Sequence, residues 1–447
     1  MIAVPFVFFI LILALVWMFG KRINVPFIIV SIFAISALFS IFIDVLDCRP
    51  AQTYFYDISF GATVVYCFLF LLCIFPLIIY SNESTISLNP VENEKLLKIV
   101  SIVFFSFFLF FILMSVDLIM NVLTGDMKLM RMLVYAGENE FWTVKLPTFM
   151  KIPASILSSL SLNSWIFLFL AFYSLCIQKL KKRYVLMFFF SSLYAPVLGI
   201  IGADRSTSTY WIISFVIMFV YFQSSMSKKE RKLLLRIGIF AAIGVFSYLV
   251  AMTNSRFNDS YYGGASGSSG GTIIYLGQTF IHFAQFFDTL NLPEKKLSVA
   301  FPLISKIFFQ NSESAVAVQR YLSNITGYQL GVFYAFFGHI MISAGKTVMF
   351  FYCGTYSLLS FVLLQRKHTS NKNIVHSVSI MEAYLFLFFS SILFLGLFGH
   401  YYSSSGRMLS VLFWGGLIFF LQRGKNETYN IDRTRFQRLD IRRMEKK

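Results

Sequence analysis

Charged residues are scarce in this chain. They make up 13% of its 447 residues, whereas 57% are hydrophobic and 19% are aromatic, including 55 phenylalanines. A soluble domain carries about 25% charged residues on a surface that water must solvate. The scarcity of charge therefore excludes a water-soluble fold of this length and indicates a protein that lies in lipid.

Side chains that bind metal ions or form disulfides are also few. The five cysteines show no metal-ligand spacing and four of them fall within apolar stretches, so neither a zinc site nor a disulfide framework is indicated. The segments expected outside the membrane hold no Asp/Glu cluster suited to Mg²⁺. We therefore expect no metal ion and no other cofactor.

The sequence instead contains many long apolar runs. A helix needs about 20 apolar residues to cross the hydrocarbon layer. Stretches of that kind lie near residues 2–19, 25–43, 59–80, 99–123, 155–177, 184–203, 205–222, 235–253, 344–364, 376–397 and 403–421. The pattern predicts an all-α integral membrane protein, a single polytopic domain over residues 1–447 with about eleven transmembrane helices.

The basic residues indicate how these helices are oriented. The segments on one side of the predicted membrane, starting with Lys21 and Arg22, hold 25 of the 38 lysines and arginines. Lysine and arginine are enriched in the short cytoplasmic loops of membrane proteins. We therefore expect the N-terminus outside the cytoplasm and the C-terminus inside it.

The same distribution bears on the partners of the chain. A formal net charge of +17 would suggest nucleic acid in a soluble protein. Here the basic residues, including those of the cytoplasmic tail over 422–447, lie where anionic lipid headgroups are expected. We therefore expect membrane lipids, and no nucleic acid, as partners.

One outward-facing segment, residues 254–343, is large and predicts a working surface outside the cytoplasm. Within it, the apolar residues of 273–287 recur at helical spacing, while Gln278, His282 and Gln285 form another stripe. This pattern predicts interfacial helices that lie on the bilayer, with His282 toward the polar side.

Two arginines stand among hydroxyl groups at the start of apolar runs. Arg205 in "GADRSTSTYW" and Arg407 in "GHYYSSSGRM" fall at the outer ends of their runs, because the residues that follow are just enough for one crossing. Such arginines can simply reach toward the lipid headgroups. The neighbouring hydroxyls and tyrosines instead favour a site for an anionic group beside a sugar, since a guanidinium pairs with phosphate through two hydrogen bonds.

Three stretches between residues 185 and 421 add a further signal. They are a turn that opens a helix in "LGIIGADRSTSTYW", the segment "TIIYLGQTFIHFAQF", and the start of a late helix in "GVFYAFFGHIMISAG". In this order they resemble the motifs of the O-antigen and capsular oligosaccharide repeat-unit polymerases (Wzy type). Two R-x10-G patterns, from Arg256 and from Arg320, are also similar to patterns in that family, whereas Asp204 stands where the family often has a small residue.

The resemblance implies a membrane glycosyltransferase. Such an enzyme polymerises undecaprenyl-diphosphate-linked oligosaccharide repeat units into O-antigen or capsule, by metal-independent inverting transfer on the periplasmic face of the bacterial inner membrane. A chain-length regulator protein is a further candidate partner.

Particular residues are candidates for each role in that reaction. Without a metal ion, cations must stabilise the leaving diphosphate, and the candidates are Arg205, Arg256, Arg320 and Arg407. The candidate catalytic bases for the acceptor hydroxyl are His339, His400 and Asp204. The candidate glycan contacts are Tyr334, Tyr401 and Tyr402. Around His339 we expect a re-entrant or interfacial helix.

Other functions stay open. An O-antigen ligase would use the same lipid donor and outer arginines but would transfer the glycan to a lipid A core. A flippase for lipid-linked oligosaccharides would show internal repeats and charges near the bilayer midplane. The chain shows no evident repeat, and Asp117 lies toward the outer end of its run. A non-catalytic scaffold would need neither the large outer segment nor the two arginines.

Overall fold

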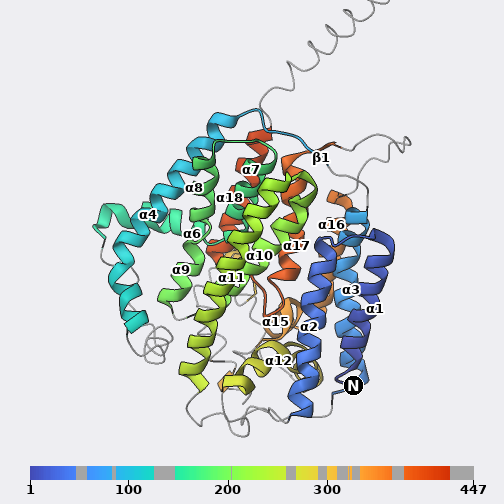
Figure 1. Ribbon diagram of the computed structural model, residues 1–447. Helices are drawn as coiled ribbons and strands as arrows, with labels where there is room; N and C mark the ends of the chain where they lie inside the picture. Colours follow the sequence, from blue (N-terminus) through green and yellow to red (C-terminus); the bar gives the residue numbers. More distant parts are fainter. Residues whose placement is uncertain are drawn as a thin grey trace, which may run out of the picture.

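The computed structural model of the chain is almost entirely helical (Figure 1). It describes residues 1–46, 58–82, 87–124, 146–202, 204–257, 268–289, 300–309, 321, 323–324, 333–364 and 377–422. The helices are α1 (Val4–Gly20), α2 (Val25–Val45), α3 (Phe60–Asn82), α4 (Glu94–Thr124), α6 (Thr148–Ser161), α7 (Ser164–Cys176), α8 (Lys182–Ser191), α9 (Tyr194–Ile201), α10 (Ser206–Phe222), α11 (Lys228–Phe257), α12 (Ser268–Thr289), α13 (Pro302–Phe309), α15 (Ala335–Ala344), α16 (Lys346–Leu364), α17 (Ile380–Phe394) and α18 (Ser405–Gln422). Two short strands, β1 (Ser87–Leu88) and β2 (Ser377–Val378), pair in parallel.

Several of these helices can cross a membrane. Among the described residues, seven helical segments are long and apolar enough, and α6 with α7, bent by 69° at their junction, makes an eighth. Each of the eleven predicted runs coincides with a helix or a helix pair, but α1, α10 and α17 are shorter, at 17, 17 and 15 residues. The structure therefore confirms an all-α, multi-pass membrane protein. The count of eleven crossings stays a prediction.

At the break between α6 and α7, two backbone carbonyls accept hydrogen bonds from α18 and from the segment before it. The Leu160 carbonyl accepts from the Ser410 hydroxyl at 2.9 Å and from the Trp414 indole at 3.0 Å. The Leu162 carbonyl accepts from the Tyr401 hydroxyl at 3.2 Å. Irregular backbone within a membrane is tolerated where protein satisfies its hydrogen bonds, so the bend depends on α18 and on Tyr401 before it.

Helix α12 lies across the lower part of the molecule in Figure 1 and packs on α2. The Ser36 hydroxyl of α2 donates to the Leu276 carbonyl at 2.7 Å, and the Ser40 hydroxyl donates to the Gly277 carbonyl. A Cβ at Gly277 would lie 2.6 Å from the Ser40 nitrogen, which is closer than real contacts. Glycine at this position therefore allows the two backbones to touch.

We expect Gly277→Ala to destabilise the protein by about 1–3 kcal/mol, because the added methyl group forces two backbones apart. Gly244→Ala on α11 is the matched control, since a Cβ there meets nothing within 4 Å. The measurement is thermal unfolding of the purified protein in detergent. Equal melting temperatures for the two variants would show that α12 does not depend on this contact.

Two residues of the predicted polar stripe of α12, His282 and Gln285, are buried, which differs from the predicted exposure, whereas the third, Gln278, is half-buried. His282 is only 2% exposed. The reason is that α12 contacts α2, α3, α11 and α15, so protein covers it on several sides. Protein therefore covers the middle of α12, including His282, while its ends at Thr272, Asp288 and Thr289 are exposed. The position of α12 relative to the bilayer surface stays a prediction.

Candidate functional site

Arg205 lies directly before the first turn of α10 and points into the protein. It is 6% exposed, and its guanidinium carbon lies 4.5 Å from the centre of the Tyr275 ring on α12. The preceding Asp204 fixes the start of α10, because its carboxylate accepts from the backbone nitrogen and the hydroxyl of Ser206, at 3.1 and 2.6 Å. The position of Arg205 is therefore not that of a side chain that reaches toward lipid headgroups.

Arg407, in the first turn of α18, repeats this arrangement. Its guanidinium carbon lies 4.2 Å from the centre of the Tyr401 ring, and its Nη1 donates to the Tyr401 carbonyl at 3.0 Å. The Arg407 carbonyl accepts from the Asn163 side chain at 2.9 Å, at the bend between α6 and α7. Each arginine thus lies over a tyrosine at the N-terminal end of a helix.

A row of aromatic rings joins the two arginines. Tyr401 contacts Tyr210 of α10, with ring centres 5.2 Å apart, and Tyr210 contacts Phe398, with ring centres 6.2 Å apart. Phe398 in turn lies 5.4 Å from Tyr275, the ring under Arg205. Arg205 and Arg407 therefore belong to one cluster, formed by α10, α12, α18 and the segment between α17 and α18.

The two histidines lie on the other side of the same cluster. The ring centres of His339, on α15, and His400, between α17 and α18, are 6.3 Å apart. Tyr334 lies 5.7 Å from His339, and Tyr402 lies 6.4 Å from His400 and 5.1 Å from Tyr401. Helix α15 has only ten residues, all of them buried, which is about 15 Å and too short for a full crossing. The re-entrant or interfacial course around His339 stays a prediction.

Burial and the nearby His339 lower the pKa of His400 below that of a free histidine. Among the described residues, the Nδ1 of His400 has no hydrogen-bond partner, and its Nε2 lies 3.5 Å from the Tyr352 hydroxyl. His400 is therefore neutral at physiological pH. A neutral imidazole with a vacant nitrogen can accept a proton.

Acidification is expected to destabilise the fold through this histidine. Below about pH 6.5 the unfolded chain binds a proton at His400, whereas the lowered pKa keeps the folded site neutral. Stability then falls by up to about 1.4 kcal/mol for each pH unit below that value. The measurement is the melting temperature at about pH 7.5 and about pH 5.5, and the fall should be smaller in His400→Asn. An identical fall in the variant would contradict the buried neutral state.

The structure thus brings together seven of the ten predicted site residues: Arg205, Arg407, His339, His400, Tyr334, Tyr401 and Tyr402. Asp204 adjoins them, but its carboxylate is engaged with Ser206. Arg320 lies outside the described residues, and so does the side chain of Arg256. Within the described part of the chain, no group of three or more His, Cys, Asp or Glu side chains is placed to hold a metal ion.

Sequence reasoning missed four members of the cluster: Tyr210, Tyr275, Phe398 and Asn163. Tyr275 and Tyr210 stand within the quoted stretches "TIIYLGQTF" and "STSTYW", so the signal was present. Asn163 interrupts an apolar run, which is a signal for a break in a helix. The contacts between different helices carry no sequence signal of this kind.

The arrangement can bind an anion and move a proton. Two guanidiniums near helix N-termini favour a doubly charged group such as a diphosphate. Tyrosine faces suit sugar rings, and a neutral histidine suits a hydroxyl that must lose its proton. Comparison of the chain with models of known protein families, with curated proteins and with solved structures gives no match.

Proposed function

We propose that this protein is a membrane glycosyltransferase that joins undecaprenyl-diphosphate-linked oligosaccharide repeat units, as the polymerases that its sequence resembles do. One observation carries the proposal. Arg205 and Arg407, each lying over a tyrosine, stand in one cluster with His339 and His400, in which Arg205 and both histidines are buried and Arg407 is half-buried. A diphosphate leaving group needs the two cations, and an acceptor hydroxyl needs the base.

In the proposed reaction, His400 accepts a proton and the two arginines stabilise the leaving group. The acceptor hydroxyl gives its proton to the neutral histidine, and its oxygen forms a bond to the anomeric carbon of the donor sugar. The bond from that carbon to the diphosphate oxygen breaks, with inversion at the carbon. The diphosphate departs with the electron pair, and Arg205 and Arg407 stabilise its charge through fixed donor geometry.

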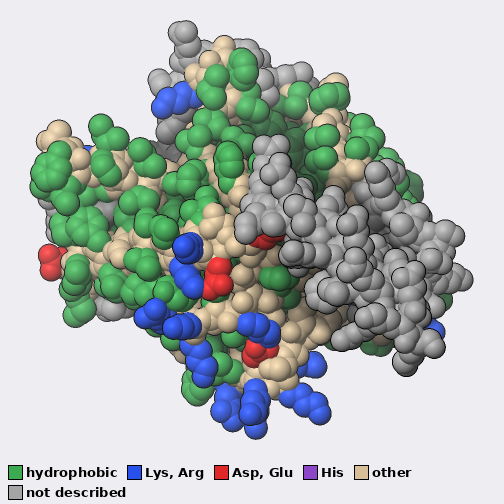
Figure 2. Space-filling view, turned by 90° about the horizontal axis from the view of Figure 1, so that it is seen from above, with side chains coloured by type: hydrophobic (Ala, Val, Ile, Leu, Met, Phe, Trp, Pro, Cys, Tyr) green, Lys and Arg blue, Asp and Glu red, His purple; other side chains and the backbone are tan. Residues whose placement is uncertain are grey.

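The surface charge supports a position of the cluster on the outer side. Figure 2 looks onto the end that lies uppermost in Figure 1 and shows lysine and arginine gathered there. The exposed basic residues of the α7–α8 connection and of the first turns of α8 and α11 are Lys179, Lys181, Lys182, Arg183, Lys228, Lys229, Arg231 and Lys232. A basic end favours the cytoplasmic side, which leaves α12, α15 and the N-terminus at the periplasmic end.

The test is a reaction with purified protein. The full chain in vesicles of phosphatidylethanolamine and phosphatidylglycerol receives the lipid-linked repeat unit, and the products are resolved on a gel. We expect a ladder of glycans that remain on the lipid carrier. Transfer only to an added lipid A core would indicate a ligase. Movement of the lipid across the vesicle membrane without a new glycosidic bond would indicate a flippase. Either result would overturn the polymerase proposal.

A further inference from the structure

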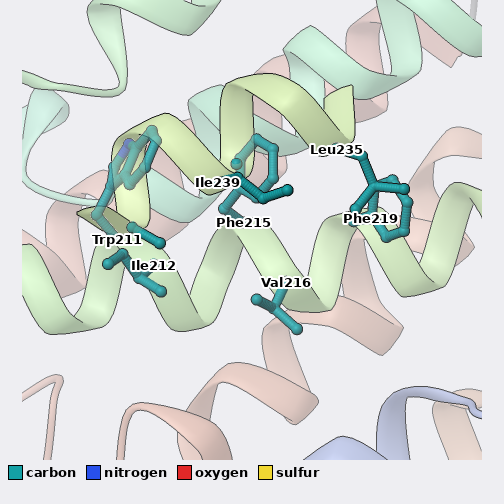
Figure 3. Close-up of a pocket in the computed structure, with 9 residues that line it drawn as sticks. Trp211, Ile212, Phe215, Val216, Phe219, Leu235 and Ile239 are labelled. Carbon is teal, nitrogen blue, oxygen red and sulfur yellow. The ribbon is translucent and has the colours of Figure 1, made fainter. Parts of the chain in front are cut away.

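A groove on the flank of the bundle lies outside the cluster described above. It has a volume of about 220 Å³ and runs between α10 and α11 (Figure 3). Trp211 lies at one end of the groove, and Phe219 and Leu235 lie at the other. All of its lining residues are apolar: Trp211, Ile212, Phe215, Val216, Phe219, Leu235, Gly238, Ile239 and Ala242.

The groove is open to the lipid. Helix α11 packs little against the rest of the described protein, and Phe240 and Phe246 on it are 75% and 67% exposed. Because the groove offers water no hydrogen-bond partners, a hydrocarbon chain fills it better than water does.

The floor of the groove is fixed by packing. Trp211 and Phe215 are stacked with ring centres 5.7 Å apart, and the Trp211 indole donates to the Ser192 hydroxyl at 2.9 Å. Across the groove, Gly238 makes room for Phe215, since a Cβ there would lie 2.6 Å from the Phe215 ring. The shape of the groove is therefore set by rigid rings and by a glycine.

One end of the groove leads toward Arg205. Arg205 stands seven positions before Ile212, directly before α10, and its backbone has helical dihedral angles. It therefore lies about two helical turns, or ~10 Å, from Ile212 and on the same side of the helix axis. The Tyr248 hydroxyl of α11 donates to the Asp204 carbonyl at 3.4 Å, so α10 and α11 also meet beside Arg205. A cation thus stands beyond one end of an apolar groove, which matches a lipid with an anionic head and a long apolar chain.

We propose that the α10–α11 groove holds the hydrocarbon chain of the carrier lipid whose diphosphate is bound at Arg205. The identity of the head group rests on the proposed function. The groove itself rests on its lining, its exposure to lipid and its alignment with Arg205. The groove thereby orients the carrier, because a chain held along α10 presents its diphosphate to the arginine.

The experiment uses a polyprenyl diphosphate that carries a photoactivatable diazirine on its chain and no sugar. The full-length protein in phosphatidylethanolamine and phosphatidylglycerol vesicles is irradiated with this probe, and labelled peptides are identified by mass spectrometry. We expect labels within residues 211–219 and 235–242. Unlabelled polyprenyl diphosphate should compete for this labelling, and added phosphatidylglycerol should not.

Two variants fill the groove from opposite walls. Ala242→Trp on α11 and Val216→Trp on α10 should each reduce the labelling by about tenfold or more. Gly244→Trp is the matched control on α11, because a side chain there enters open space, and it should label normally. All variants are compared as monodisperse protein at equal amounts.

Undiminished labelling in both groove variants, or equal competition by phosphatidylglycerol, would overturn the inference. The probe lacks sugar, so its binding is independent of glycan transfer. If the protein labels normally in the groove but makes no glycan ladder, the proposal that the groove binds the lipid chain stands and the proposed polymerase function is rejected. If the protein makes a normal ladder but is labelled only outside the groove, the proposed lipid binding in the groove is rejected and the proposed polymerase function stands.

Discussion

Arg205→Lys and Arg407→Lys are each expected to shift the products from long glycans toward single repeat units, with a loss in rate of roughly 10- to 100-fold. Both variants keep the positive charge. They lose the planar fork that can pair with two phosphate oxygens and that lies over the ring of Tyr275 or Tyr401. Charge alone should therefore not restore function. The measurement is the glycan ladder in a strain that lacks its own copy, at equal membrane abundance.

The chain offers a matched control for these variants. Arg183 also lies over a tyrosine, with its guanidinium carbon 4.8 Å from the Tyr184 ring centre, but it is exposed at the basic end of the molecule. Arg183→Lys should leave the ladder unchanged. Normal ladders from both Arg205→Lys and Arg407→Lys would show that the two arginines do not hold a diphosphate.

Removing the imidazole of His400 should have an effect as large or larger. We expect His400→Ala to lower kcat by about 10²–10⁴-fold, the usual contribution of a general base, while KM changes little. The reason is geometric: the buried Nδ1 of His400 has no hydrogen-bond partner among the described residues, so it is open to the proton of an acceptor hydroxyl. His339→Ala should have a smaller effect, because His339 acts on the ring of His400 from 6.3 Å.

His282→Ala is the control for this series. His282 is also a buried histidine whose pKa burial lowers, but its ring neighbour is Phe286 of its own helix. It should retain most of the activity at equal protein abundance. If His400→Ala retained activity as well, the base would have to be sought elsewhere, and unchanged surface glycan in His339→Ala would remove that residue from the site.

The sequence predicted the helices because a run of apolar residues long enough to cross a bilayer has few alternatives to helix. It also placed Arg205 at the start of α10, since the length of the run left no other place. For Arg407 the same argument began the helix near Tyr402, whereas α18 begins at Ser405. The intervening residues contribute Tyr401 and Tyr402 to the cluster instead of continuing the helix.

The prediction was wrong where it depended on contacts between distant segments. Helical spacing identified the polar stripe of α12, but spacing says nothing of what covers a stripe, and the bundle buries His282. The pairing of Arg205 with Tyr275 joins residues 70 positions apart on different helices. A single sequence gives residue types and their periodicity, and only the packing of helices shows which faces meet.

The contact between α2 and α12 has a consequence for biosynthesis. Ser36 and its partner Leu276 are 240 positions apart, so α2 enters the membrane long before α12 has been translated. During that interval the Ser40 hydroxyl has a partner within its own helix, the Ser36 carbonyl at 3.1 Å. Helix α2 can therefore lie in lipid before α12 is made without leaving the Ser40 hydroxyl unsatisfied. The nascent bundle then closes around its N-terminal helices only when the second half of the chain arrives.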